Sequence, residues 1–412
     1  MDPVAPNPQR SRVARLLRRT SFVADPAAIT ALADEHWDSA LHAALDTTEN
    51  PGIPPDPEEN EDIGFDEIMN WWVDQMLRPD GGLYEKMVWF WHSHLTTNHR
   101  DVNSSVLVRR QLMLFREHAL GNFRQLLHAF VIDGALLRYL NGAGSEASNP
   151  NENLARELME LFTTGLGNYT EDDIKAAARA LAGWTVDRET LEVKFVRERS
   201  FVAPLLFRGE QAVFDTAAIV DHLCNDVATA TYVANKIFHY LGGIWLPENE
   251  ALALGRWWHG QNLEVRPLLE RIITHEHFET AHYNRPRTGL EFYCALRTAT
   301  GVELEHVRTL RSLGQMPYEP PNVAGWPTDE RWLEPGSILR RGALINGLDF
   351  DDIHDPMPGT VDHVLERCGL LSFSQATLDA MNQIGITTQL DDVGRAQVRW
   401  RLALSSAEFQ LT

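Results

Sequence analysis

Two histidines lie two positions apart in the aromatic segment 90–94, which reads Phe-Trp-His-Ser-His. Imidazole nitrogens are common metal ligands, and in an extended segment His92 and His94 would face the same way, as paired ligands do. On a helix their directions would differ by about 200°, and each imidazole would more simply bond to the backbone of a packed core. The segment therefore supports two interpretations, a metal site and a histidine-containing core, and His118 adds a third imidazole in a helical context.

Carboxylates flank an apolar stripe in the segment 151–162, which reads NENLARELMELF. At helical spacing the stripe consists of Leu154, Leu158, Leu161 and Phe162. Asn153, Glu157 and Glu160 fall beside it, so we expect the two carboxylates to be partly buried and to face at least one of the histidines. There they could bind a cation or act as a general base. The alternative is a surface ladder of ion pairs, because Glu152, Arg156 and Glu160 also share a helix face.

These residues combine into one site hypothesis, a divalent cation held in a helical core. Its proposed ligands are His92, His94, His118, Glu152, Glu157 and Glu160. Its proposed catalytic residues are Glu157, Glu160 and Arg156, with Arg156 orienting a carboxylate or a substrate anion. Substrate would contact Asn151, Asn153 and Trp326. Imidazole and carboxylate ligands suit zinc, iron or manganese, and an open coordination position would activate water or dioxygen. The predicted function is therefore a metal-dependent enzyme, either a hydrolase or an oxidoreductase.

A non-catalytic scaffold that binds a partner protein is the alternative function. Its anchors would be Trp326 and Trp332, in the segment 315–335 that is rich in Pro, Gly and Trp. A stoichiometric transition metal in the purified protein would favour the enzyme over the scaffold. Other enzyme classes lose support, because His275 and His277 are too close for an HExxH zinc motif and the sequence contains no P-loop, Rossmann or GxSxG motif.

Helices must position these residues, since apolar side chains recur at helical spacing along most of the chain. The predicted fold is mainly α, a large multi-helix globular domain with one short β-hairpin insertion near 191–206, where apolar and charged residues alternate. Near the N-terminus, Asp25 before Pro26 is typical of a helix start and predicts one helix over 25–45.

The predicted organisation has three parts. N-terminal helices occupy 1–47, an acidic proline-rich linker occupies 48–67, and a main helical domain occupies 68–412. Within the main domain, Thr170 lies three residues before Asp173, which predicts a capping box at the start of a helix.

Composition excludes several function classes for this chain of 412 residues. Its 58 Asp and Glu outnumber 37 Lys and Arg, and the resulting formal charge of -21 repels phosphate backbones and anionic lipid headgroups, so we expect no general nucleic-acid binding. The sequence contains no run of about 18 apolar residues, so it predicts no membrane-spanning helix. Arg18 and Arg19 resemble part of a twin-arginine signal, but acidic residues interrupt the stretch that follows, so we expect a cytoplasmic location.

Six motifs occur in the order found in one large bacterial family. They read FWHSH at 90–94, REHALGNF at 116–123, NENLARELMELF at 151–162, YTEDD at 169–173, ARALAGW at 178–184 and PPNVAGWP at 320–327. Together with ARLLRRTSF at 14–22, these segments resemble the domain-of-unknown-function family DUF1800 over about residues 14–341.

The resemblance implies a helical protein without an established activity. Many members of the family look exported and are encoded beside a sulfatase-like or phosphatase-like protein, which the resemblance makes the expected partner. We expect no export signal of the usual kind in this chain, and FRGEQAVFD at 207–215 stands where the resembled family commonly has His-Asp-x-Gly-x-Lys. If that histidine takes part in an activity of the family, the activity is altered or lost in this chain.

Overall fold

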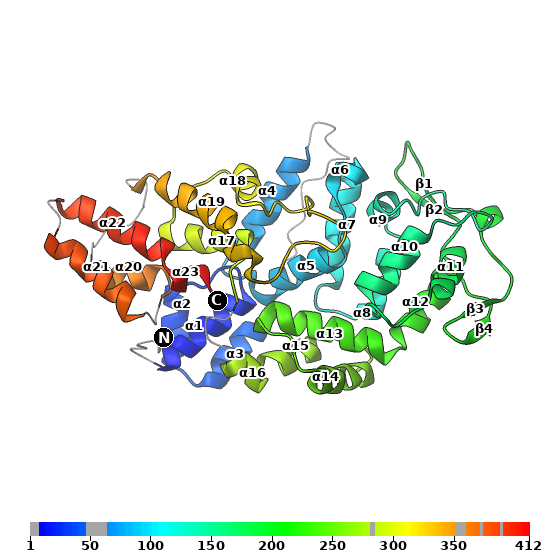
Figure 1. Cartoon of the computed structure of the whole chain (residues 1–412), viewed down its shortest axis with the longest axis horizontal. Helices are drawn as coiled ribbons and strands as arrows, with labels where there is room; N and C mark the ends of the chain where they lie inside the picture. Colours follow the sequence, from blue (N-terminus) through cyan, green and yellow to red (C-terminus); the bar gives the residue numbers. More distant parts are fainter. Residues whose placement is uncertain (1–7, 47–63, 281–284, 351–359, 371–373, 388–389) are drawn as a thin grey trace.

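Helices dominate the computed structural model, which describes residues 8–46, 64–280, 285–350, 360–370, 374–387 and 390–412. Over these residues the chain is mainly helical (64%), with two small antiparallel sheets of two strands each, so the predicted mainly α class is confirmed. The body is elongated, with the strands at one end and helices from the C-terminal part at the other (Figure 1). None of the described helices is long and apolar enough to cross a membrane.

Three helices open the chain: α1 (Pro8–Thr20), α2 (Pro26–Ala33) and α3 (Trp37–Leu45). Asp25 caps α2 as predicted, since its carboxylate accepts a hydrogen bond at 3.1 Å from a backbone N–H of the first turn. The single helix predicted over 25–45 is wrong, because α2 ends at Asp34 and His36 has extended backbone with a ψ of 146°. The turn lets both short helices pack against α1.

The predicted linker at 48–67 lies mostly outside the described residues, which resume at Gly64. Its last residues are helical, because α4 (Phe65–Met76) begins at Phe65. The Phe65 ring is buried and stacks on His99 with 3.8 Å between ring centroids, which fixes the start of this helix against the body.

The central helix is α5 (Gly82–His94), and nearly all of its residues are buried. α1, α3, α4 and α7 pack against it, so polar groups on α5 must find partners inside the protein. The neighbouring helices are α6 (His99–Val102), α7 (Ser105–His118), α8 (Phe123–Val131) and α9 (Gly134–Tyr139).

The segment 151–162 is helical but changes its geometry halfway. α10 (Glu152–Glu157) continues into a π-helical turn, η1 (Leu158–Phe162). The Thr163 and Thr164 hydroxyls bond two carbonyls of this turn, those of Leu158 at 2.6 Å and Met159 at 3.0 Å. α11 (Glu171–Ala180) then begins at the predicted capping box between Thr170 and Asp173.

Strands form two hairpins, where one was predicted near 191–206. β1 (Trp184–Val186) pairs with β2 (Val193–Phe195), and β3 (Leu205–Phe207) pairs with β4 (Glu210–Ala212). Asp187 closes the first turn by accepting hydrogen bonds from two backbone N–H groups. Arg208 and Gly209, both at positive φ, close the second turn. The alternation seen in the sequence therefore belongs to halves of two hairpins, separated by a short 3-10 turn, η2 (Arg197–Arg199).

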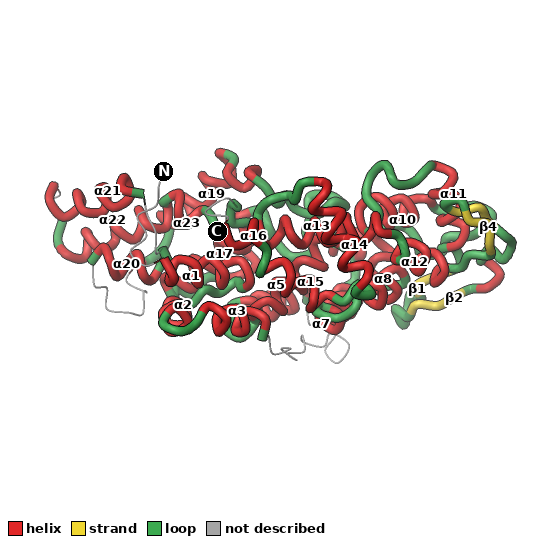
Figure 2. Tube along the Cα trace, turned by 90° about the horizontal axis from the view of Figure 1, so that it is seen from below, coloured by secondary structure: helices red, strands yellow, loops and turns green. Residues whose placement is uncertain are grey.

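The remaining helices fold back along the body (Figure 2). They are α12 (Thr216–Cys224), α13 (Val227–Gly242), α14 (Glu248–Gly260), α15 (Val265–Ile273), α16 (Glu276–Thr280), α17 (Gly289–Thr300), α18 (His306–Leu313), the 3-10 turn η3 (Glu330–Leu333), α19 (Pro335–Asn346), α20 (Val361–Arg367), α21 (Gln375–Thr387), α22 (Asp392–Ser405) and α23 (Ala407–Gln410). The end of the chain returns to α1, because the Arg19 side chain donates to the main-chain oxygen of Thr412 at 3.2 Å.

Candidate functional site

His92 is a core residue in the structure. Its side chain is fully buried on α5, and Nε2 accepts a hydrogen bond from the Tyr318 N–H at 3.1 Å. The rings of Trp89 and Trp326 lie 5.4 and 5.3 Å from it. Burial lowers the pKa of His92 to about 3, so the imidazole is neutral at physiological pH.

His94 is also buried, but it reaches a cavity. Its Nε2 lies 3.1 Å from the Phe162 carbonyl oxygen, and since a carbonyl only accepts, this nitrogen carries the hydrogen. Nδ1 then presents a lone pair, and it has no hydrogen-bond partner within the described chain. Burial, assisted by the charge of Lys236, lowers the pKa of His94 well below its ordinary value.

The carboxylates of 151–162 make contacts of another kind. Arg156 donates to both oxygens of Glu171 at 2.8 and 2.9 Å and to Glu152 at 3.4 Å, so for Arg156 the ion-pair interpretation agrees with the structure. Glu160 accepts a hydrogen bond from the Tyr169 hydroxyl at 2.6 Å. Burial, with repulsion from Glu160, raises the pKa of Glu157. Asn151 caps α10 by accepting from the Asn153 N–H at 2.8 Å.

The expected metal ligands do not come together as a set. Glu157 and Glu160 are partly buried, as predicted, and His118 is partly buried at the end of α7. Across the described residues, no group of three or more His, Cys, Asp or Glu side chains could hold a metal ion. His94 meets the end of the 151–162 segment at Phe162, through its carbonyl oxygen and its ring, and not through the carboxylates.

A cavity of ≈ 190 Å³ lies beside His94, and we call it the aromatic cavity. Its lining consists of Trp89, Phe90, Ser93, His94, Lys236, His239, Tyr240, Trp245, Arg285, Thr288, Gln315, Ala324, Trp326, Pro327, Thr328 and Arg331. Two sequence-predicted site residues, His94 and Trp326, therefore share this site. The other predicted residues lie outside its wall.

Five parts of the chain build the aromatic cavity: the last turns of α5, the second half of α13, Trp245 in the loop after α13, the segment 285–288 before α17 and the loop 315–331. Gly325 lets the loop approach α5, since its φ is +84° and a Cβ there would lie 2.5 Å from the Ser93 carbonyl oxygen. This close approach turns Trp326 towards the cavity wall, where its ring lies 5.2 Å from that of Trp89. On the opposite wall, His239 stacks on Trp245 at 4.1 Å between centroids.

Positively charged side chains gather in this cavity. The described residues that line it include Lys236, Arg285 and Arg331 but neither Asp nor Glu. Arg285 and Arg331 are bound to carboxylates behind the wall, those of Glu291 and Asp329.

Lys236 differs from these two arginines. Its ammonium lies 5.2 Å from the centroid of the Tyr232 ring, and no ion pair is formed with a described carboxylate. Burial lowers the pKa of Lys236 to about 8. The Tyr240 hydroxyl and the Trp326 Nε1 are buried without hydrogen-bond partners in the described chain. A ligand that accepts hydrogen bonds would satisfy these groups.

Sequence reasoning missed the residues that α13 contributes. Lys236, His239 and Tyr240 are spaced i, i+3 and i+4, which places them on one face of a helix. They lie in the mostly apolar run 233–241, VANKIFHYL, and polar groups on one face of such a run were the available signal. Arg285 and Arg331, the other two cations of the cavity wall, were missed as well.

Comparison with protein families matches residues 15–411 to the family described as "Protein of unknown function (DUF1800)". No curated protein and no solved structure matches the chain. The family match includes every element that lines the aromatic cavity and extends beyond the segments that suggested the resemblance. The chain belongs to the DUF1800 family.

Proposed function

We propose that the aromatic cavity binds a small organic anion with an aromatic or other flat apolar part. The observation that carries this proposal is the charge of the cavity wall: three cations and, among the described residues, no carboxylate line it, in a chain with a formal charge of -21. This distribution of charge favours an anion in the cavity, because the attraction between opposite charges is stronger in a poorly hydrated space than at the protein surface.

The rest of the wall supports the same ligand class. Trp89, Trp245 and Trp326 offer flat apolar surfaces, on which a planar group can stack. The unused Tyr240 hydroxyl and Trp326 N–H can donate to anionic oxygens, and the Lys236 ammonium can neutralise the charge. His94 Nδ1, which has no hydrogen-bond partner in the described chain, can accept a hydrogen bond from a bound molecule.

Replacing Lys236 by methionine should weaken anion binding while keeping the apolar stem of the side chain. We expect benzenesulfonate to bind the parent chain saturably and Lys236→Met at least about tenfold more weakly, since a hydrogen bond to a charged group contributes roughly 1.5–3 kcal/mol. Tryptophan fluorescence reports binding, because three tryptophans line the cavity. The matched control is Lys175→Met, which alters an exposed lysine on α11 and should leave the affinity unchanged. Equal affinity of both variants would refute the proposal.

Affinity for benzenesulfonate should fall as the pH rises through about 8. Burial lowers the pKa of Lys236 to about 8, so the lysine is charged below this pH and loses its charge above it. Benzenesulfonate keeps its charge over this range, so the change comes from the protein. Titrations at pH 7, 8, 9 and 10 measure the effect, with the neutral methyl phenyl sulfone as the control ligand. A flat profile for benzenesulfonate would show that Lys236 does not carry the interaction.

The metal-dependent hydrolase or oxidoreductase predicted from the sequence stays a prediction. Mutual repulsion between Glu157 and Glu160 is the observation that favours a cation near them. Metal analysis of the purified chain tests this prediction. A stoichiometric metal that is lost in Glu157→Gln would support the site, and a purified chain that contains no metal would contradict it. The sulfatase-like or phosphatase-like partner and the cytoplasmic location are likewise predictions. Trp326 and Trp332, the expected anchors, are buried with 7% and 4% of their surface exposed.

A further inference from the structure

Lysine is rare in this chain, and Lys236 differs from the other lysines. The 37 Lys and Arg include only four lysines, which are Lys86, Lys175, Lys194 and Lys236. Lys175 and Lys194 are exposed and bind neighbouring aspartates at 3.2 and 2.8 Å. Among the four, only Lys236 forms no ion pair with a described carboxylate. An ion pair therefore does not explain why a lysine occupies this position.

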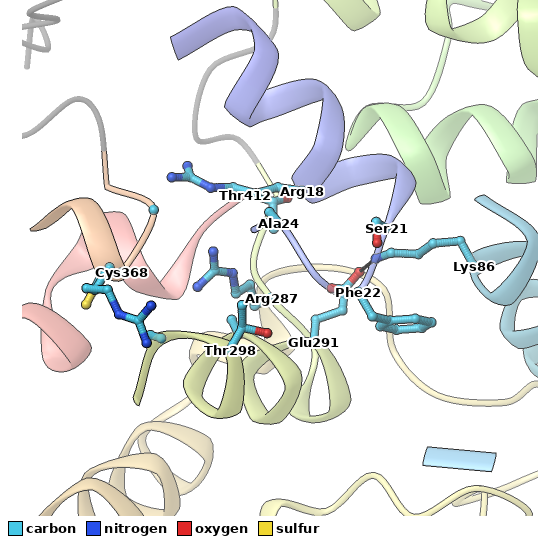
Figure 3. A pocket seen from close by; sticks show the side chains of 14 residues that line it. Arg18, Ser21, Phe22, Ala24, Lys86, Arg287, Glu291, Thr298, Cys368 and Thr412 are labelled. Carbon is cyan, nitrogen blue, oxygen red and sulfur yellow. Dashed lines mark hydrogen bonds and ion pairs between the residues drawn. The ribbon is translucent and has the colours of Figure 1, made fainter. Parts of the chain in front are cut away.

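Burial alone does not distinguish Lys236, because Lys86 is buried as well. Lys86 extends from α5 to the carboxylate of Glu291, which its ammonium binds at 2.5 Å (Figure 3). Burial lowers the pKa of both lysines to about 8. Lys236 instead lines the aromatic cavity. Of the two buried lysines, it is therefore the one that a ligand in this cavity can reach.

An amine in this position can do what the neighbouring guanidinium groups cannot. With a pKa of about 8 instead of the ordinary 10.5, about a quarter of Lys236 is neutral at pH 7.5, compared with about one in a thousand for an ordinary lysine. The neutral amine has a lone pair and is a nucleophile towards carbonyl carbons. Arg285 and Arg331, in the same wall, keep their charge and can hold an anionic group.

Groups that can assist such a reaction lie beside Lys236. Tyr240 follows it by one turn of α13, and the Tyr240 hydroxyl, buried without a hydrogen-bond partner in the described chain, can donate to a carbonyl oxygen. The Tyr232 ring lies 5.2 Å from the Lys236 ammonium and 6.4 Å from the His94 ring, so the lysine and the histidine are near each other. The unpartnered Nδ1 of His94 can accept a hydrogen bond from a reaction intermediate.

We propose that Lys236 forms an imine with a flat aromatic carbonyl compound that carries an anionic group, an inference that rests on the proposed function of the aromatic cavity. The neutral amine attacks the carbonyl carbon, and a proton moves from the nitrogen to the carbonyl oxygen to give a carbinolamine. The hydroxyl group then leaves as water with the second proton of the nitrogen, and a C=N bond forms. The reaction needs neither oxidant nor reductant, and hydrolysis reverses it.

Reductive trapping of the full chain with 4-formylbenzenesulfonate and sodium cyanoborohydride at pH 7.5 tests this proposal. Cyanoborohydride reduces the imine to a stable secondary amine, and mass spectrometry locates it, since each of the four lysines falls in a different tryptic peptide. Lys236 should be labelled at least about tenfold faster than Lys175 and Lys194, because far more of its amine is neutral. These two exposed lysines are matched controls within the same sample.

Two further measurements place the reaction in the cavity. Benzenesulfonate, which has no carbonyl group, should slow the labelling of Lys236 but not that of Lys175 and Lys194. Lys236→Arg keeps a positive charge without a nucleophilic amine, so the rapid labelling should disappear, while benzenesulfonate should bind this variant more tightly than it binds Lys236→Met.

The outcomes separate this inference from the proposed function. Labelling of Lys236 no faster than that of the two control lysines would overturn the imine, and saturable binding of benzenesulfonate to the same sample would leave the anion site standing. Rapid labelling of Lys236 in a chain that does not bind benzenesulfonate would support the imine and refute the anion site. Rapid labelling that persists in Lys236→Arg would come from another amine and would overturn the imine.

Discussion

Replacing Glu291 by glutamine is expected to lower the free energy of unfolding by about 3–5 kcal/mol, because removing one partner leaves buried charges uncompensated. Glu291 is 5% exposed, and its carboxylate neutralises both Arg285 and Lys86, which are 3% and 1% exposed. Glutamine keeps the shape but supplies no negative charge. Two buried cations, Arg285 and Lys86, would then face each other without the carboxylate that they share.

Urea denaturation of the parent chain and the variant measures this loss. Glu303→Gln is the matched control, since Glu303 pairs with Arg297 at 2.8 Å but is 81% exposed, and an exposed pair contributes at most about 1 kcal/mol. A loss for Glu291→Gln no larger than that of the control would contradict the network.

The pH dependence of the free energy of unfolding tests the same prediction in a second way. Burial alone would raise the pKa of Glu291, but Arg285 and Lys86 outweigh it and hold the pKa well below the ordinary value of 4.5. A depressed carboxyl pKa stabilises the folded state above the unfolded pKa, and this stabilisation is lost as the pH falls below about 4.5. The parent chain should therefore lose more stability than Glu291→Gln between pH 5 and pH 3.

Local signals in the sequence predicted local structure well. Asp25 and the Thr170–Asp173 pair start helices where expected, because a capping group and its N–H partners lie within one turn of chain. The hairpins were harder to predict, because the turn at Arg208–Gly209 depends on two adjacent residues with positive φ, one of which is an arginine. A pattern of alternation alone did not show where one hairpin ended and the next began.

Only part of the candidate site was predicted, because the residues that form it are far apart in the sequence. His94 and Trp326 are over 200 positions apart and stand in motifs that the sequence made visible. Lys236 has only a weak local signal, and it becomes significant because α13 lines the cavity together with α5 and none of the described carboxylates pairs with the lysine. Conversely, Glu157 and Glu160 had a suggestive local pattern, but the Glu160 carboxylate binds the Tyr169 hydroxyl, and His94 reaches this segment at the Phe162 carbonyl instead.

The position of α13, which carries Lys236, rests on its contact with α14. Gly255 of α14 lies against α13 so closely that a Cβ would stand 2.5 Å from the Thr231 Cα and 2.7 Å from its backbone nitrogen. Backbone atoms cannot rotate away as a side chain can, so the two helices would have to separate.

Gly255→Ala should therefore destabilise the protein by about 3 kcal/mol or more, at the upper end of overpacking effects, although alanine favours helices over glycine. It should also weaken benzenesulfonate binding, because separation from α14 would displace α13 and the cavity wall that it carries. Gly260→Ala in the same helix is the matched control, since a Cβ at Gly260 would meet no atom within 4 Å. Urea denaturation measures the stability of both variants, and fluorescence titration measures their binding of benzenesulfonate. If Gly255→Ala is as stable as Gly260→Ala, α13 and α14 do not approach each other as closely as described. If it is destabilised but binds benzenesulfonate as the parent chain does, the helix contact stands and the cavity wall does not depend on it.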